Sequence, residues 1–119
     1  MRAGIERITP EEALAESRDG AIIVDTRSDD ARRRHGIIPG SVHIPLSVLY
    51  WRLDPTSGHD DKAVSGRDRR IVVVCADGYS SSLATAQLVG LGFTRAADLA
   101  GGFAAWAAAG LPVEAAQPG

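Results

Sequence analysis

The strongest constraint on the fold is a pair of short apolar runs, each of which ends at a polar or reactive side chain. Residues 21–24 (Ala-Ile-Ile-Val) end at Asp25, and residues 71–74 (Ile-Val-Val-Val) end at Cys75. Neither run alternates with polar residues, which is typical of strands buried on both faces, as in a parallel sheet. We therefore expect two internal strands whose last residues lie near one another.

Signals for helices separate these strands. Thr9 and Glu12 have the spacing of a capping box and Pro10 suits the first helical position, so we expect a helix from there to about Ser17. A second helix is expected over residues 81–89, with these residues facing the core: Leu83, Ala84, Leu88 and Val89. The other expected elements are strands over 5–8, 42–44 and 97–99, a polar turn over 29–34, a helical segment over 47–53, an exposed loop over 54–70 and a last helix over 103–109. Strands that alternate with helices predict an α/β fold with a mainly parallel sheet.

Size and composition restrict the class of protein further. The chain has 119 residues, 45% hydrophobic and 24% charged, which predicts one globular domain over residues 1–114 and a short tail over 115–119. The net charge of −2 gives no basic field for nucleic acid. No apolar run approaches the roughly 20 residues of a membrane span, and the N-terminus lacks the apolar core of a signal peptide. We expect a cytoplasmic protein that binds neither nucleic acid nor membrane; the oligomeric state is left open.

Cys75 is the single cysteine, so it can form neither an internal disulfide nor a cysteine-rich zinc site. It directly follows a predicted buried strand, and a helix is expected a few residues later. The backbone N–H groups of such a loop, with the helix N-terminus behind them, favour an anion and lower the pKa of a thiol from about 8.5. Gly78 allows a tight turn, and Ser80 and Ser81 can add hydroxyl donors. The loop is therefore suited to hold a thiolate or a persulfide; the alternative is that Cys75 is only a small buried hydrophobic residue.

Three sequence blocks carry a resemblance to a known family. The first is Ile-Val-Asp-Thr-Arg at 23–27 with residues 36–45, Gly-Ile-Ile-Pro-Gly-Ser-Val-His-Ile-Pro. The second is residues 71–81, around Cys75, and the third is Leu-Gly-Phe at 91–93 with residues 99–106 and 110–113. In this order and spacing, the blocks resemble the rhodanese-like sulfurtransferase domains over nearly the whole chain.

The resemblance implies a five-stranded, mainly parallel sheet flanked by helices on both faces. It also implies that Cys75 is the catalytic residue, which takes a sulfur atom from a small-molecule or protein donor as a persulfide and passes it to a thiol or another nucleophile. No cofactor or metal is expected. The candidate substrate-binding residues are the loop residues Ala76, Asp77, Gly78, Tyr79, Ser80 and Ser81, together with Arg27.

The chain departs from the family pattern in the Cys75 loop. Family loops often carry a basic residue directly after the cysteine and an arginine five positions after it, where this chain has Ala76 and Ser80. Asp77 adds an acid instead. At an effective dielectric of about 20, two charges about 4 Å apart interact by about 4 kcal/mol. Even half of this value weakens binding more than tenfold. We therefore expect poor use of the dianion thiosulfate and better use of a less charged donor or a protein persulfide.

Two alternative functions remain. A cysteine-based phosphatase or arsenate reductase needs an arginine six residues after its cysteine, where this chain has Ser81. A catalytically weak module that binds a partner or senses reactive sulfur is favoured by the missing loop arginine. An intact Cys75 in a glycine-bearing loop favours sulfur handling over this second alternative.

Other polar and aromatic residues have simpler interpretations. Asp25 and Arg27 are interpreted as a scaffold pair, with Arg27 the candidate cation that reaches the loop from outside. Tyr79 either lines the mouth of the site or is merely exposed. Phe103 and Trp106 are expected in the core, and one of the adjacent Tyr50 and Trp51 must face away from it. Residues 59–61 (His-Asp-Asp) and 32–34 (Arg-Arg-Arg) are expected to be solvated rather than a metal site and a nucleic-acid patch.

Overall fold

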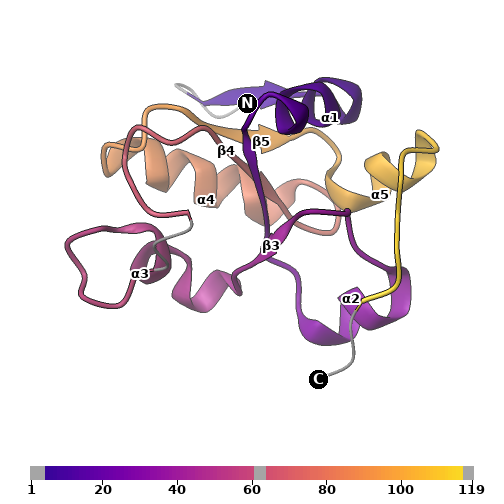
Figure 1. Ribbon diagram of the computed structural model, residues 1–119, viewed down its shortest axis with the longest axis horizontal. Helices are drawn as coiled ribbons and strands as arrows, with labels where there is room; N and C mark the ends of the chain where they lie inside the picture. The colour runs from indigo at the N-terminus through magenta and orange to yellow at the C-terminus, as the bar shows by residue number, and fades with distance from the viewer. Residues whose placement is uncertain (1–4, 61–63, 117–119) are drawn as a thin grey trace.

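The computed structural model of the chain describes residues 5–60 and 64–116. These segments form a central sheet with helices on either side (Figure 1). Within the described residues, the sheet has five strands: β1 (Glu6–Ile8), β2 (Ile22–Asp25), β3 (Val42–His43), β4 (Ile71–Val74) and β5 (Ala96–Leu99). They pair in parallel, in the order β1-β5-β4-β2-β3. The predicted α/β fold with a five-stranded parallel sheet is confirmed.

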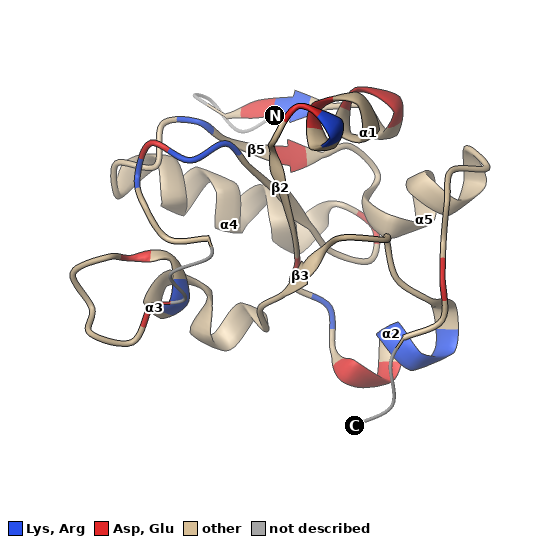
Figure 2. Cartoon of the chain, in the orientation of Figure 1, with Lys and Arg blue, Asp and Glu red and all other residues tan. Residues whose placement is uncertain are grey.

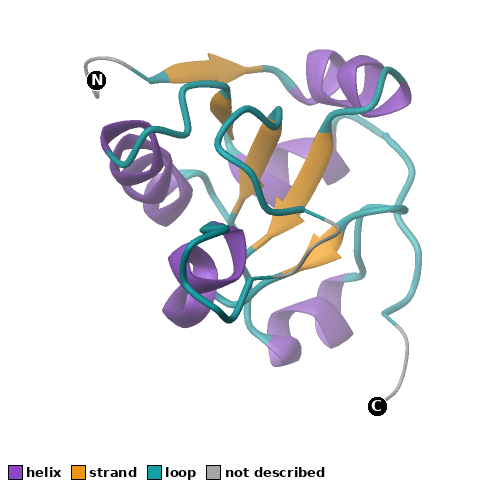
Figure 3. Cartoon of the chain, turned by 60° about the vertical axis from the view of Figure 1, so that its left-hand side comes forward, coloured by secondary structure: helices purple, strands orange, loops and turns teal. Residues whose placement is uncertain are grey.

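Helices cover both faces of the sheet, as Figure 3 shows from a second direction. One face packs against α1 (Pro10–Arg18) and α5 (Gly102–Ala108), and the other against α3 (Leu49–Leu53) and α4 (Tyr79–Gly90). The shorter elements are α2 (Asp29–His35) and the 3₁₀ turn η1 (Leu46–Val48). The three inner strands β2, β4 and β5 thus have an apolar layer above and below them, as a buried parallel sheet requires.

Strand β4 is the centre of this arrangement and explains the strongest pattern in the sequence. All four of its residues are buried, with Ile71 and Val73 in the core beneath α3 and α4 and Val72 and Val74 in the core beneath α1 and α5. Because both faces are covered, no position of the strand can be polar without a buried partner. Cys75 follows at the carboxyl end of this strand, where sites of open α/β sheets are formed.

The expected start of α1 is confirmed in detail. Thr9 accepts a hydrogen bond from the backbone N–H of Glu12, and the Glu12 carboxylate accepts one from the backbone N–H of Thr9, which completes the capping box. Residues 29–34 were expected as a polar turn, and this is wrong. Ser28 caps a true helix, α2, whose first turn carries Asp29 and Asp30 and whose last turn is basic, in agreement with the helix dipole.

Three other expectations need correction. Helix α4 begins at Tyr79 and not at residue 81, because Gly78 is left-handed (φ +93°) and the Asp77 carboxylate accepts a hydrogen bond from the backbone N–H of Tyr79. Leu83 was expected in the core but is 39% exposed. The core side of α4 carries Ala84 and Leu88, as expected, together with three buried residues that bear hydroxyl groups: Ser81, Ser82 and Thr85. Residues 47–53 are not one helix but η1 followed by α3.

The described residues of the segment after α3 are exposed or half-buried, except that Val64 is buried in the core beneath α3 and α4. Phe103 and Trp106 are buried as expected. Among the described residues no helix is long and apolar enough to cross a membrane.

Candidate active site

The Cys75 sulfur lies in a cup formed by the turn between β4 and α4. Cys75 is only 4% exposed, and its Sγ accepts a hydrogen bond from the backbone N–H of Gly78 at 3.0 Å. The Ser81 hydroxyl lies 3.2 Å from the same sulfur. A backbone amide, a hydroxyl and the first turn of α4 therefore surround the sulfur, and the amide and the helix N-terminus favour a negative charge on it.

The start of α5 holds this turn from the opposite side. The backbone N–H of Phe103 donates to the Cys75 carbonyl at 2.8 Å, and that of Ala104 donates to the Ala76 carbonyl at 3.0 Å. Gly102 makes this approach possible, because a Cβ on it would lie 2.5 Å from the Cys75 carbonyl oxygen and 2.7 Å from the Gly78 nitrogen. The glycine pair at 101–102 is not among the predicted site residues. Its role in supporting the turn was missed.

The electrostatics of the cup favour the thiolate on balance. Burial raises the pKa of the Cys75 thiol. Hydrogen bonds from the hydroxyls of Ser81 and Ser80 and from backbone N–H groups at Ser81 and Asp77 lower the pKa and outweigh burial, so it lies below its ordinary value. A thiol with this environment is a better nucleophile near neutral pH than an ordinary buried cysteine.

No side chain of the turn supplies a positive charge. Residues 75–81 include no Lys or Arg, and Figure 2 shows that α4 and α5, the two helices beside the cup, carry no charged residue at all. Asp77 adds a negative charge: its Oδ1 lies 3.9 Å from Cys75 Sγ and 3.1 Å from the Tyr79 backbone nitrogen. The carboxylate is therefore turned toward the cup and not away from it.

Behind Ser81 lies a carboxyl group that the sequence analysis did not single out. The Ser81 hydroxyl donates to Oδ1 of Asp98 on β5, and Oδ2 of Asp98 accepts from Arg7 Nε at 3.0 Å. The Asp98 side chain is fully buried, and burial raises its pKa although its bonds to Ser81 and Arg7 oppose the rise. The sequence around Asp98 contains no motif that indicates a role for this residue. Its contact with Ser81 follows only from the position of β5 in the sheet.

Arg27 and Asp25 form the expected buried pair. The guanidinium donates to both carboxylate oxygens, at 3.0 Å and 2.8 Å, and to the Gly36 carbonyl at 2.7 Å. Its central carbon also stacks 3.8 Å from the centroid of the Phe103 ring. Arg27 lines a cavity of about 300 Å³ together with Ala76 and Phe103, so its side chain lies beside the Cys75 turn rather than in the cup.

The remaining candidates separate into exposed and buried groups. Tyr79 is 69% exposed on the first turn of α4. Trp51 is exposed and stacks on His59, whereas Tyr50 packs against the core and contacts Gln87, so only one of the two adjacent aromatics faces inward, as expected. No cluster of three metal-ligating side chains exists in residues 5–60 and 64–116, and Asp61 lies outside these ranges.

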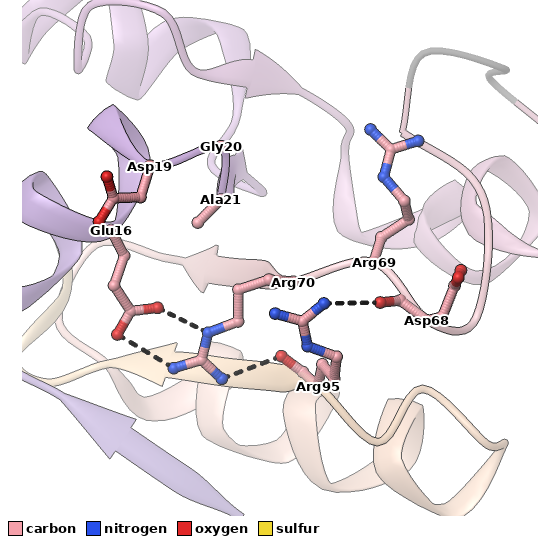
Figure 4. A pocket seen from close by; sticks show the side chains of 8 residues that line it. All are labelled: Glu16, Asp19, Gly20, Ala21, Asp68, Arg69, Arg70 and Arg95. Carbon is pink, nitrogen blue, oxygen red and sulfur yellow. Dashed lines mark hydrogen bonds and ion pairs between the residues drawn. The ribbon is translucent and has the colours of Figure 1, made fainter.

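A second hollow, of about 440 Å³, lies at the opposite end of the strands (Figure 4). Its lining residues come from the segments that precede β2, β4 and β5, far from the carboxyl ends. Arg70 there pairs with Glu16 and Glu6 and donates to the Arg95 carbonyl, and Arg95 donates to the Asp68 carbonyl. These contacts connect the loops at the amino ends of the strands.

Comparisons with known proteins agree with the fold. The model of the rhodanese-like domain family matches residues 9–109, which include every strand except β1. The chain belongs to the family of rhodanese-like domains. A thiosulfate sulfurtransferase, GlpE, from Pseudomonas savastanoi pv. phaseolicola is 41% identical over 103 residues, 87% of this chain and 88% of the relative. A sulfurtransferase from Allochromatium vinosum is 32% identical, over 86% and 85% of the two chains.

Solved structures share the fold of this rhodanese-like domain. A protein of unknown function from Rhodopseudomonas palustris, described as a possible tyrosine phosphatase, has a TM-score of 0.85 and 34% identity over 94% of this chain and 86% of that one. A rhodanese-related protein from Thermoplasma volcanium has a TM-score of 0.70 and 28% identity over 91% and 96% of the two chains.

Proposed function

We propose that this rhodanese-like domain is a sulfurtransferase in which Cys75 carries the sulfur atom as a persulfide. The observation that carries the proposal is the cup itself: a buried sulfur at the end of β4 that receives a backbone N–H at 3.0 Å and faces a hydroxyl at 3.2 Å. Relatives at 41% and 32% identity that are named sulfurtransferases support the same class of reaction.

The proposed reaction has two steps. In the first, the Cys75 thiolate attacks the outer sulfur of the donor; a new S–S bond forms, and the donor's bond to that sulfur breaks with its electron pair on the leaving group. In the second, a thiolate or another nucleophile attacks the outer sulfur of the persulfide, and Cys75 leaves as the thiolate. The same N–H and hydroxyl donors stabilise the anion before the first step and after the second.

We propose further that thiosulfate is a poor donor. It brings two negative charges to a cup without a loop cation, and the Asp77 carboxylate is 3.9 Å from the sulfur that attacks. The guanidinium of Arg27 is already paired with Asp25. A less charged donor, or a persulfide on another protein, avoids this repulsion. Because the Pseudomonas savastanoi relative is named a thiosulfate sulfurtransferase, thiosulfate is the donor against which the others are compared.

A second candidate function is a module that binds a partner or senses reactive sulfur without efficient turnover. The absence of a cation in the Cys75 turn favours it. Phosphatase chemistry is disfavoured, because the position that would hold a phosphate-clamping arginine is Ser81, which is buried and bonded to Asp98.

The test is the mass of the intact protein after separate exposure to thiosulfate, polysulfide and mercaptopyruvate, with a Cys75→Ser variant as the control. The proposal predicts the gain of one sulfur that requires Cys75, that disappears on addition of cyanide or a thiol, and that is slowest with thiosulfate. Fast loading by thiosulfate would contradict the argument from charge. No gain from any donor would favour the binding module over the sulfurtransferase.

A further inference from the structure

Asp98 is a buried carboxyl group that the sulfur transfer described above does not use. Its side chain is fully buried, yet it is only two hydrogen bonds from the reactive sulfur: Cys75 Sγ lies 3.2 Å from Ser81 Oγ, and the Ser81 hydroxyl is bonded to Asp98 Oδ1. Ser81 itself has no exposed surface. Solvent therefore does not reach the middle of this chain of three groups.

The fold holds the three groups in place from three elements. Asp98 lies on β5, where its register partners are Arg7 on β1 and Val73 on β4. Ser81 lies in the first turn of α4, and Cys75 lies at the end of β4. Two charged groups among the described residues face Cys75, Ser81 and Asp98. Arg7 is half-exposed and lies 3.0 Å from Asp98 Oδ2, and Asp77 lies 3.9 Å from the sulfur.

The three groups hold two protons, and these can be arranged in two ways. In one, the Cys75 thiol donates to Ser81 Oγ, the Ser81 hydroxyl donates to Asp98, and Asp98 is a carboxylate. In the other, Asp98 is a carboxylic acid that donates to Ser81, and the Ser81 hydroxyl donates to a Cys75 thiolate. Both arrangements carry one negative charge and use the same two contacts.

We propose that Asp98 is a positioning residue that takes up the Cys75 thiol proton through Ser81 and returns it when the free thiol is restored. The S–H bond of Cys75 breaks as an O–H bond forms on Ser81, whose own proton moves to Asp98 Oδ1. No electron leaves or enters the chain of groups. The proposal deepens the proposed function, since it assumes that Cys75 acts as the nucleophile.

The environment of the two end groups supports this exchange. Burial raises the pKa of Asp98, whereas the hydrogen bonds of the cup lower the pKa of Cys75, so the two values lie closer together than in water. A proton then moves between them with a smaller change in free energy than it would in water. If Asp98 were only a scaffold residue, it would stay a carboxylate bound to Arg7 and Ser81 at every pH near neutrality.

The experiment measures the rate of Cys75 alkylation by iodoacetamide against pH. Coupled groups titrate in two macroscopic steps, so the wild-type rate should rise to a plateau and then rise again. Asp98→Asn keeps the shape of the side chain and can donate to Ser81 but cannot take up a proton, so its profile should show one step. Ser81→Ala should also show one step and react about tenfold more slowly at neutral pH, because a hydrogen bond to a charged group is lost.

Ser82→Ala is the matched control. Ser82 is the next residue of α4, is also buried, and donates its hydroxyl to the Tyr79 carbonyl rather than to the chain of groups around Cys75. Its profile should keep both steps. Thermal unfolding of each variant confirms that it is folded at the pH values used.

The ¹³C chemical shift of the Asp98 carboxyl group gives a second measurement. If Asp98 had only a scaffold role, this shift would not change with pH near neutrality. In the wild type, this signal should titrate with the same midpoints as alkylation, and Cys75→Ser should shift its midpoint. Superimposable alkylation profiles for the wild type and Asp98→Asn would overturn the proposal, as would an Asp98 signal that does not respond to Cys75→Ser. Because alkylation needs no sulfur donor, a failure here is distinct from a failure to gain sulfur in the mass measurement.

Discussion

Gly102→Ala tests whether the start of α5 holds the Cys75 turn in its reactive shape. The residue has φ +62°, and an added Cβ would lie 2.5 Å from the Cys75 carbonyl oxygen, 2.7 Å from the Gly78 nitrogen and 2.8 Å from the Asp77 nitrogen. All three contacts are with backbone atoms, so no flexible side chain can move aside. The turn or the first residues of α5 must shift instead.

Two effects add to the destabilisation. A left-handed conformation costs an alanine about 1–2 kcal/mol, and overpacking of a buried site costs about 1–3 kcal/mol more. Gly110→Ala isolates the first effect, because Gly110 has φ +76° and no atom within 4 Å of an added Cβ. We expect Gly102→Ala to melt about 4–12 °C below Gly110→Ala, at about 4 °C per kcal/mol for a domain of this size.

The same substitution should lower the reactivity of Cys75. A shifted turn weakens the 3.0 Å hydrogen bond from the Gly78 backbone to the sulfur. Because a hydrogen bond to a charged group is worth about 1.5–3 kcal/mol, the thiolate fraction and the alkylation rate near neutral pH should fall at least about tenfold. Equal melting temperatures and equal alkylation rates for Gly102→Ala and Gly110→Ala would show that α5 does not support the site.

Three other predictions follow from the site. Arg27→Met leaves Asp25 without its bidentate partner and should lower the free energy of unfolding by about 3–5 kcal/mol in denaturant titrations; a loss under about 1 kcal/mol would contradict a structural role for the pair. Asp77→Asn should speed sulfur loading from thiosulfate about tenfold without a comparable effect on a neutral organic trisulfide, as followed by intact mass, and equal changes for both donors would argue against charge repulsion. Finally, the folded-state pKa of Cys75 lies below that of an unfolded thiol, so the unfolded chain binds more protons between the two values. The stability of the wild type relative to Cys75→Ser should therefore rise with pH through this window, up to about pH 8.5, and a constant difference would show that the pKa is not lowered.

The parts of the fold that the sequence predicted are those with a local chemical signature. Thr9 and Glu12 define a helix start by their spacing alone, and the apolar run of β4 requires burial on both faces. The position of Cys75 at the carboxyl end of a strand could be predicted, because the apolar run of β4 ends directly before it. The seven-residue α2 was taken for a turn because none of its residues is buried, so no apolar periodicity marks it.

The parts that the sequence did not predict depend on contacts between distant segments. Asp98 meets Ser81 and Arg7 only because β5 lies between β1 and β4, and no pattern around residue 98 indicates a partner. Leu83 was assigned to the core by its hydrophobicity. Ser81 takes the inward position instead because its hydroxyl is satisfied by the Asp98 carboxyl, and Leu83 turns outward.

A single-turnover transfer shows whether Cys75 carries a sulfur atom from a donor to an acceptor. The protein is loaded with ³⁴S-labelled polysulfide, freed of excess donor and mixed with a small thiol, and the masses of protein and thiol are followed with time. We expect the label to leave the protein and to appear on the thiol at the same rate, and we expect Cys75→Ser to acquire none. A label that stays on the protein, or that loads equally well without Cys75, would show that Cys75 is not the sulfur carrier.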